Sequence, residues 1–232
     1  DPDAVAKLLA GEAIIALGMT EAEAGSAVTD LTTRARPDGE GFRVSGGKVF
    51  TSNSPDADLF LVYLRFAEGL EGIGSVLLER GADGFELGQP SRYMNGETWC
   101  ALYFDEVYVP PETVLLGPGG FKRQIAGFNA ERIGNTARSL ALGQFAFERA
   151  REHAMTRQQF GRPLCEFQGI QWKFADMQIK LDAGRLLLYR AAVNADRGLP
   201  LVQETSIAKA FCNQAGFELC NEAMQIMGGT GY

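Results

Sequence analysis

Hydrophobic and polar positions follow two different patterns along the chain, and the change between them falls near residue 117. Before it, short apolar runs alternate with turns rich in Gly, Pro, Asn and Asp. Short runs at regular spacing, separated by such turns, predict an antiparallel sheet that forms a sandwich or a barrel. The predicted strands are residues 13–17, 27–33, 42–45, 48–51, 59–64, 75–78, 101–104 and 107–109.

Beyond the glycine-rich segment 117–120, which we interpret as a hinge, apolar residues recur every three or four positions. This is the period of an α-helix. The pattern predicts one helix over residues 121–157, a second over residues 164–196, and a third that contains Ala208 and stops before Gly228. Long helices with continuous apolar seams pack as a bundle.

The second helix carries the most regular apolar seam. Two interpretations stay open, because the seam could form the core of the bundle or include a contact between subunits. Small residues on this helix, such as Gly184 and Ala191, permit close approach of another helix in either case. The seam consists of Phe167, Ile170, Phe174, Met177, Leu181, Gly184, Leu188 and Ala191.

The composition is that of a globular protein. The 232 residues suffice for one large domain or two small ones, with 46% hydrophobic and 22% charged residues. A net charge of −7 argues against a surface for nucleic acid or anionic membranes. No apolar run approaches the ~18 residues of a membrane span, and the acidic start does not resemble a signal peptide. We therefore expect a cytoplasmic protein that binds neither nucleic acid nor membrane.

Cysteine and histidine narrow the chemistry further. Cys100, Cys165, Cys212 and Cys220 show no CxxC spacing, which predicts buried free thiols in a reducing compartment. His153 is the only histidine and lies in a charged helical stretch, where a surface position is expected. A histidine-rich metal site is therefore excluded, and we expect no metal.

The stretch 19–26 is a turn between two predicted strands and carries the hydroxyls of Thr20 and Ser26 together with Gly25. A glycine can adopt a positive φ and lets the backbone approach a ligand. Exposed N–H groups beside hydroxyls can bind phosphate or carbonyl oxygens. On the residue types alone, an ordinary hairpin loop is the favoured interpretation of this stretch.

Five stretches in one order resemble the flavin-dependent acyl-CoA dehydrogenases. Residues 20–26 (TEAEAGS) resemble the family's TEPxAGSD signature, and residues 44–53 (VSGGKVFTSN) its xxGxKxxITN hairpin. Residues 157–168 resemble RxxFGxPLxxFQ, and residues 225–232 (QIMGGTGY) resemble QxxGGxGY. Residues 104–110 match the strand that ends the family's β-domain. Each motif alone is weak, but five in the family order make coincidence improbable.

The resemblance implies an α+β fold, in which a middle domain built as an antiparallel β-barrel or sandwich precedes an antiparallel helical bundle. Residues 1–12 then correspond to the end of the family's N-terminal helical domain, most of which the sequence lacks. Residues 13–117 correspond to the middle domain, and residues 118–232 to an incomplete C-terminal bundle, because family members continue beyond this point.

The resemblance also implies a reaction: FAD-dependent α,β-dehydrogenation of an acyl-CoA thioester. A carboxylate removes the α-proton, and flavin N5 accepts the β-hydride. Two positions for this base stay open. One is Glu131, where a minority of the family holds it, and the other lies beyond Tyr232, in a segment that this sequence does not contain. The substrate contacts implied are Ser26, Asn129 and Arg132.

The cofactor contacts implied fall in four groups. The first group lies in the turn 19–26 and contacts the flavin and the acyl-CoA. The second group lies in the hairpin 44–53, which covers the flavin. The third reaches the flavin of a neighbouring subunit, where Arg157 suits a pyrophosphate, and the fourth lies near the adenosine. The four groups are Met19, Thr20, Gly25 and Ser26; Phe50, Thr51 and Ser52; Arg157, Gln159 and Phe160; and Gln225, Gly228 and Gly229.

The implied partners are an acyl-CoA substrate, an electron-transfer flavoprotein as oxidant, and further copies of the chain in a dimer or tetramer. Departures from the family pattern include Ala22, Ala27, Phe50 in place of Trp, Asn129 in place of Asp, and the loop 92–97. Two rival functions stay open: an acyl-CoA oxidase-like relative that reduces oxygen, and a non-catalytic or partner-dependent subunit.

Overall fold

The structure is a computed structural model that describes residues 2–195 and 198–232. It divides into two units, Asp1–Gln124 and Ile125–Tyr232. Helix α2 (Phe121–Thr156) runs through this division, so the boundary expected at residues 117 and 118 stays a prediction. Asp1 and Asp196, at the ends of two predicted segments, lie outside the described residues.

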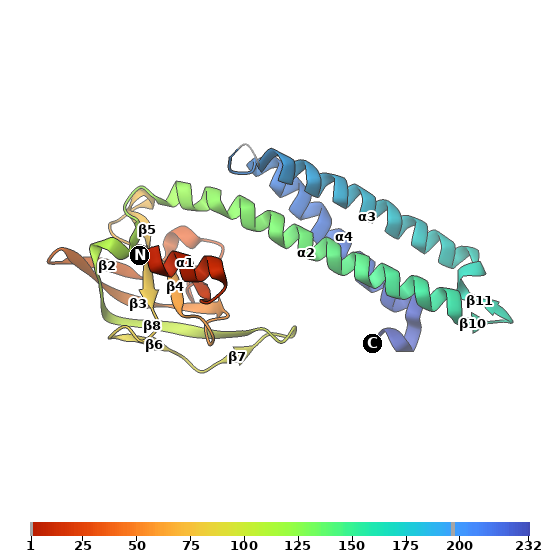
Figure 1. The fold of residues 1–232 in the computed structure, drawn as a ribbon, viewed down its shortest axis with the longest axis horizontal. Helices are drawn as coiled ribbons and strands as arrows, with labels where there is room; N and C mark the ends of the chain where they lie inside the picture. The colour runs from red at the N-terminus through yellow and green to blue at the C-terminus, as the bar shows by residue number, and fades with distance from the viewer. Residues whose placement is uncertain (1, 196–197) are drawn as a thin grey trace. The chain divides into compact units, whose positions relative to one another are not determined.

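The first unit is built on a nine-stranded sheet, preceded by helix α1 (Pro2–Ala10) (Figure 1). Along the sheet the order is β6-β8-β3-β2-β4-β5-β9, with β1 beside β4 and β7 beside β8. Most pairs are antiparallel, but β4 is parallel to both β1 and β2, so the sheet is mixed. The strands are β1 (Ile15–Gly18), β2 (Arg34–Asp38), β3 (Gly41–Ser52), β4 (Leu59–Arg65), β5 (Ile73–Glu79), β6 (Phe85–Leu87), β7 (Ser91–Arg92), β8 (Thr98–Val109) and β9 (Val114–Leu116).

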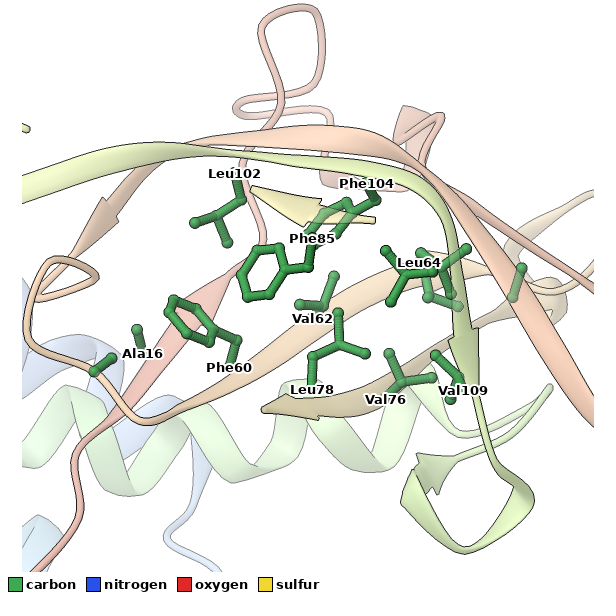
Figure 2. Close-up of a cluster of buried hydrophobic side chains, with 14 residues drawn as sticks. Ala16, Phe60, Val62, Leu64, Val76, Leu78, Phe85, Leu102, Phe104 and Val109 are labelled. Atoms are coloured by element: carbon green, nitrogen blue, oxygen red, sulfur yellow. The ribbon is translucent and has the colours of Figure 1, made fainter. Parts of the chain in front are cut away.

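The core of this unit lies on one face of the sheet, where aliphatic and aromatic side chains from β1, β2, β3, β4, β5, β6 and β8 meet (Figure 2). Phe85 lies at its centre, edge-on to Phe60 at 4.8 Å and stacked on Phe104 at 5.3 Å between ring centroids. Such aromatic pairs add to the free energy gained by burying apolar area. The expected β-domain is therefore confirmed, with parallel pairs that the sequence did not predict.

The predicted strand over residues 27–33 is wrong. Residues Val28–Asp30 form a short 3₁₀ helix, η1. The amides of Thr32 and Thr33 donate to the side chain of Glu21 and not to a neighbouring strand. A Thr- and Val-rich run forms a strand only when a neighbouring strand accepts its backbone hydrogen bonds. Here the carboxylate of Glu21 accepts them instead.

The turn predicted at Gly46 and Gly47 is a bulge inside a long strand, and two pairs of predicted short strands are each one strand. Residues 42–45 and 48–51 belong to the single strand β3, and residues 101–104 and 107–109 to the single strand β8. The register between these strands shifts at Val44/Gly46, where Gly46 has φ 138°. A Cβ on Gly46 would lie 2.7 Å from Thr33 Cα, so only glycine fits. Glycine in this strand marks a bulge, as glycines in strands often do.

The second unit is a bundle of the long helices α2, α3 (Gln168–Ala195) and α4 (Val202–Met227), which lie side by side (Figure 1). A small hairpin of β10 (Gln158–Gln159) and β11 (Arg162–Pro163) joins the first two helices. This confirms the predicted helical domain. Short 3₁₀ helices complete the chain: η2 (Leu70–Gly72), η3 (Pro111–Thr113), η4 (Leu164–Glu166) and η5 (Gly228–Gly231).

Glycines bring the helices of the bundle close together. A Cβ on Gly216 of α4 would lie 2.6 Å from Ser139 O of α2. One on Gly143 of α2 would lie 2.6 Å from Leu219 Cδ1. Contacts under 3 Å require the backbone or a side chain to move, so α2 and α4 pack at these positions because neither residue has a side chain.

The seam of α3 lines the core of the bundle, as the first of the two interpretations expects. Met177, Leu181, Gly184 and Ala191 are buried, and the remaining helical members pack against the same cluster. A different row on α3 is exposed and recurs every seventh position. It consists of Trp172, Ile179, Leu186 and Val193, which are 61–71% exposed.

Two further expectations are settled by the structure. All four cysteines are free, with Cys100 and Cys212 buried and Cys165 and Cys220 partly buried. Burial raises the pKa of the Cys212 thiol. Among the helices that the structure describes, none combines the length and the apolar character needed to cross a membrane.

Candidate functional site

A buried ion pair joins the turn 19–26 to strand β3. Lys48 Nζ lies 2.7 Å from Glu21 Oε1, and the two side chains are 0% and 7% exposed. The same carboxylate accepts hydrogen bonds from Thr32 N (2.6 Å), Thr32 Oγ1 (2.8 Å) and Thr33 N (3.0 Å). All four donors satisfy a charge that burial has removed from water.

The protonation of this pair follows from its surroundings. Burial alone would raise the pKa of Glu21, but the hydrogen bonds from Lys48, Thr32 and Thr33 and the charge of Lys48 outweigh it. The pKa of Glu21 falls from 4.5 to about 2. Burial lowers the pKa of Lys48, and the hydrogen bond and charge of Glu21 oppose that shift. Glu21 is therefore ionised at neutral pH.

The backbone of the turn is tied to the same strand. Lys48 Nζ donates to Met19 O at 3.1 Å, and Val49 N donates to Thr20 O at 2.8 Å. Glu21 and Ala24 exchange backbone hydrogen bonds of 3.1 and 3.2 Å, which close the turn. The predicted contacts in the turn and in β3 are thus brought together by bonds within one unit.

The turn presents groups that can bind a ligand. Thr20 is half-buried, Ser26 is exposed, and no hydrogen bond within the described residues uses either hydroxyl. A Cβ on Gly25 would meet nothing within 4 Å, so the backbone there is open to a ligand. Free hydroxyls next to open backbone fit the polar edge of a flavin or a thioester oxygen.

Strand β3 continues from Lys48 into three predicted flavin contacts that face in different directions. Phe50 is 56% exposed and has φ 56°, and its ring lies 4.8 Å from that of Trp99. Ser52 is half-buried, whereas Thr51 is fully buried and its hydroxyl lacks a hydrogen-bond partner among the described residues. Tyr93 stacks on Trp99 at 6.0 Å, which extends the aromatic surface beside Phe50.

The predicted base lies near the start of α2 in the second unit. Glu131 is exposed and accepts a hydrogen bond of 3.3 Å from Asn135 Nδ2. Asn129 is 2% exposed and accepts a 2.7 Å bond from Arg132 Nη1. Glu131, Asn129 and Arg132 thus lie within one helical turn of each other.

The third predicted group lies at the opposite end of α2, in the β10–β11 hairpin. Phe160 and Gly161 form its turn with φ 52° and 79°, the backbone of a type I′ turn. A bulky residue such as Phe160 rarely adopts a positive φ. Its side chain is 94% exposed, and its ring centroid lies 6.2 Å from that of Phe167. Arg157 is exposed, and no ion pair within the described residues involves it.

The fourth predicted group lies at the same end of the bundle as the hairpin. Gln225, Gly228 and Gly229 are exposed where α4 ends, and Gly228 has φ 60°. The last turns of α2 and α4 share one buried cluster, which places both groups together (Figure 1). An arginine beside exposed glycine amides provides the donors that a pyrophosphate or a nucleotide needs.

The helical unit therefore holds two separate groups of predicted site residues. At a rise of about 1.5 Å per residue, Glu131 and Thr156 lie about 37 Å apart along α2.

The sequence reasoning missed three features of this site. It quoted Glu21 and Lys48 within motifs but did not pair them, and it did not single out Trp99 or Tyr93. A lysine on the buried face of a strand is a signal that a carboxylate lies opposite, since lysine is almost never fully buried unless paired. Within the described residues, no cluster of His, Cys, Asp and Glu could hold a metal ion.

Comparisons with known proteins identify the family. Residues 16–107 match the description "Acyl-CoA dehydrogenase, middle domain", and residues 118–232 match "Acyl-CoA dehydrogenase, C-terminal domain". The chain belongs to the acyl-CoA dehydrogenase family. Acyl-CoA dehydrogenases are FAD-dependent flavoproteins. A glutaryl-CoA dehydrogenase of Mycobacterium smegmatis, solved in complex with FADH2, is similar in structure, with a TM-score of 0.92 and 25% identity. The match covers 99% of this chain and 59% of that one.

Individual relatives carry several names. The short-chain-specific acyl-CoA dehydrogenase of Megasphaera elsdenii is 35% identical over 97% of this chain and 60% of its own length. A 3-sulfinopropanoyl-CoA desulfinase of Advenella mimigardefordensis is also 35% identical, over 94% and 57%. The chain thus spans about three fifths of the length of these curated relatives.

Solved structures agree with the family. The butyryl-CoA dehydrogenase of Megasphaera elsdenii has a TM-score of 0.92 and 34% identity, covering 97% of this chain and 61% of that one. A chain in a structure described as the electron transferring flavoprotein of Acidaminococcus fermentans has a TM-score of 0.94 and 32% identity, covering 99% and 62%. The family expected from the five motifs is confirmed.

Proposed function

We propose that this chain supplies the flavin- and substrate-binding parts of an FAD-dependent acyl-CoA dehydrogenase. The observation that carries the proposal is the junction at Lys48 and Val49. It holds the turn 19–26, with its unbonded hydroxyls, beside the exposed ring of Phe50. The chemistry of these groups fits a flavin ring and the thioester oxygen of an acyl-CoA.

The residues of the turn bind and orient the reactants in this proposal. FAD, when bound, supplies the hydride acceptor for the β-carbon of the thioester. Thr20 and Ser26 donate to oxygens of the flavin and the acyl-CoA, while Phe50 covers one face of the ring system. Donors aimed at the thioester oxygen would also stabilise the enolate that develops as the α-proton leaves.

The proposal assigns removal of the α-proton to Glu131. Among the described residues, one 3.3 Å hydrogen bond holds its carboxylate, so the carboxylate is free to turn toward a bound substrate. Glu131 is exposed in this structure, and its carboxylate is a chemical group that can take a proton from the α-carbon of a bound thioester. The half-buried Arg132 lies beside it for the polar parts of the substrate, and the buried Asn129 holds Arg132 through the 2.7 Å hydrogen bond.

The cofactor site is proposed to be shared between two copies of the chain. Arg157, Gln159 and Phe160, with Gln225, Gly228 and Gly229, would bind the pyrophosphate and adenosine of an FAD whose flavin lies in another copy. The separation of about 37 Å along α2 supports this division. The exposed row on α3 supports association into a dimer or tetramer, since apolar patches mark protein interfaces.

An electron-transfer flavoprotein is the proposed oxidant of the reduced flavin. The similarity to a chain in a structure described as an electron transferring flavoprotein supports this assignment. An oxidase-like relative would reduce oxygen instead, and a partner-dependent subunit would bind FAD only with another chain. Aerobic reoxidation rates and FAD binding by the isolated chain separate these alternatives.

An anaerobic titration tests the proposal. The purified chain, loaded with FAD, receives short, branched and long acyl-CoA thioesters in turn while the visible flavin absorption is recorded. We expect one class to bleach the flavin. Glu131→Gln should abolish bleaching, whereas Glu148→Gln, which changes another exposed, amide-bonded glutamate of α2, should not. Bleaching that survives Glu131→Gln would contradict the assignment of the base, and no bleaching by any thioester would contradict the reaction.

A further inference from the structure

The ion pair of Glu21 and Lys48 lies between the two flavin-facing segments of the first unit. Glu21 belongs to the turn, directly after Met19 and Thr20, and Lys48 precedes Val49 and Phe50 in β3. The side chain of Lys48 is fully buried and that of Glu21 is 7% exposed, so the pair is almost closed off from a bound flavin. Besides each other, they contact the carbonyl of Met19, which is a proposed flavin contact, and Thr32 and Thr33, which follow the turn.

Each contact of the pair fixes one of these segments. Lys48 Nζ donates to Met19 O as well as to Glu21, and so holds the start of the turn against β3. Glu21 binds the amides of Thr32 and Thr33, which hold the chain that leaves the turn. Thr33 Oγ1 in turn lies 3.1 Å from Gly47 O and 3.2 Å from Gly47 N, which returns the network to β3.

We propose that Glu21 and Lys48 are positioning residues, which set the distance and orientation between the turn 19–26 and Phe50 and thereby shape the flavin site. This inference rests on the proposed function, because it concerns the same site. The inference predicts that Glu21 and Lys48 affect how FAD binds, beyond any effect that they have on the free energy of unfolding.

Stability is a weak reason for such a pair. Two apolar side chains of similar volume often stabilise a core as well as a buried ion pair does. They cannot, however, donate to Met19 O or accept from the amides of Thr32 and Thr33. An apolar replacement should therefore keep the fold and lose the fixed geometry of the turn, which separates positioning from stabilisation.

The test compares the unmodified chain with the double variant Glu21→Met/Lys48→Met. The matched control is Asp38→Asn/Arg43→Gln, which removes an exposed ion pair of 2.7 Å that also involves β3. Circular dichroism monitors folding, and FAD dissociation constants, the visible spectrum of the bound flavin and its midpoint potential are measured. The spectrum and potential are readouts that a purely structural role would not move.

We expect the double variant to fold, to bind FAD about tenfold more weakly and to shift the flavin spectrum, the size of effect seen when groups that support metal ligands are removed. The control should match the unmodified chain. FAD binding, spectrum and potential all unchanged in the double variant would overturn the inference. If the unmodified chain binds no FAD, the proposed function fails first and this inference fails with it.

A milder variant covers the case in which the double variant does not fold. Thr32→Val removes only the hydroxyl that donates to Glu21 and keeps the amide bond. We expect it to fold, to shift the flavin spectrum in the same direction and to weaken FAD binding about threefold, as expected for one hydrogen bond. An unchanged spectrum and affinity in this folded variant would equally overturn the inference.

Discussion

The two units hold their predicted site residues in opposite ways. In the first unit, the turn 19–26 and β3 are joined by a buried ion pair and by backbone hydrogen bonds. In the second, Arg157, Phe160 and Gln225 are exposed at the end of the bundle, away from its buried cluster. In the first unit, polar contacts hold the predicted site residues in position. In the second unit, the helices that carry these residues hold them in position.

This difference teaches where the chain tolerates change. Removing a member of the buried network leaves a charge or a donor without a partner, which costs free energy and displaces the site. Replacing an exposed residue at a helix end removes a ligand contact and leaves the fold intact. The predictions below compare the two units, from the largest expected effect on stability to the smallest.

Removing the ammonium of Lys48 should have the largest effect. Lys48→Met leaves the Glu21 carboxylate buried without its counter-charge, and we expect a loss of about 3–5 kcal/mol in the free energy of unfolding. In the second unit, Lys180→Met breaks a half-exposed pair with Glu218 at 2.6 Å and should cost under about 1 kcal/mol. Denaturant unfolding measures both; equal losses would contradict the comparison.

Acid should destabilise the chain through Glu21. The folded pKa of Glu21, about 2, lies below its ordinary value of 4.5, so its contribution is complete above pH 4.5. It is lost as the pH falls toward 2 and amounts to about 3 kcal/mol. Unfolding curves measured from pH 6 to pH 2 should show this loss, and Glu21→Met/Lys48→Met should flatten the dependence. If the free energy of unfolding of the double variant fell equally steeply with pH, other carboxylates would be responsible for the loss.

Two buried threonines should respond in opposite directions. The hydroxyl of Thr51 has no partner among the described residues, so Thr51→Val should stabilise the chain by about 1–2 kcal/mol. Thr136 Oγ1 donates to Arg132 O at 2.7 Å, so Thr136→Val should destabilise it by about 1 kcal/mol. Thermal unfolding of both variants checks the signs, and a loss of stability in Thr51→Val would indicate that its hydroxyl has a partner.

Arg157→Ala and Phe160→Ala should change the free energy of unfolding by less than about 0.5 kcal/mol, because both side chains are exposed. FAD binding should nevertheless weaken in each, since the proposal places both residues against the cofactor. Calorimetry with and without FAD separates the two effects. Unchanged FAD affinity in both variants would remove this end of the bundle from the site.

The helices were the most predictable part of the fold. The seam through Met177, Leu181 and Gly184 has the helical period, and these residues are buried along one face of α3. The sheet was less predictable because distant partners decide it. Thr32 and Thr33 have strand propensity, but their amides donate hydrogen bonds to Glu21 and not to a neighbouring strand. Gly46 was predicted to lie in a turn, but it forms a bulge in which Thr33 fills the space that a side chain on Gly46 would need.

The candidate site shows the same division. Motifs pointed to Phe50 and Arg157 because resemblance works residue by residue along the chain. Resemblance gave no signal for Trp99 of strand β8, whose ring lies 4.8 Å from that of Phe50 and is tilted against it, or for the bond from Lys48 to Met19 O. Contacts between residues far apart in sequence depend on strand register, and a bulge that shifts the register changes which side chains meet.

One measurement tests the shared site most directly. Phe50→Asp damages the flavin end in the first unit, and Arg157→Glu damages the pyrophosphate end in the second; both side chains are exposed, so both variants should fold. Each variant alone should bind FAD poorly. Co-expressed, they should recover FAD binding, because mixed assemblies contain sites in which neither change is present. Binding no better than that of the separate variants would mean that each site lies within one copy, which would contradict the account.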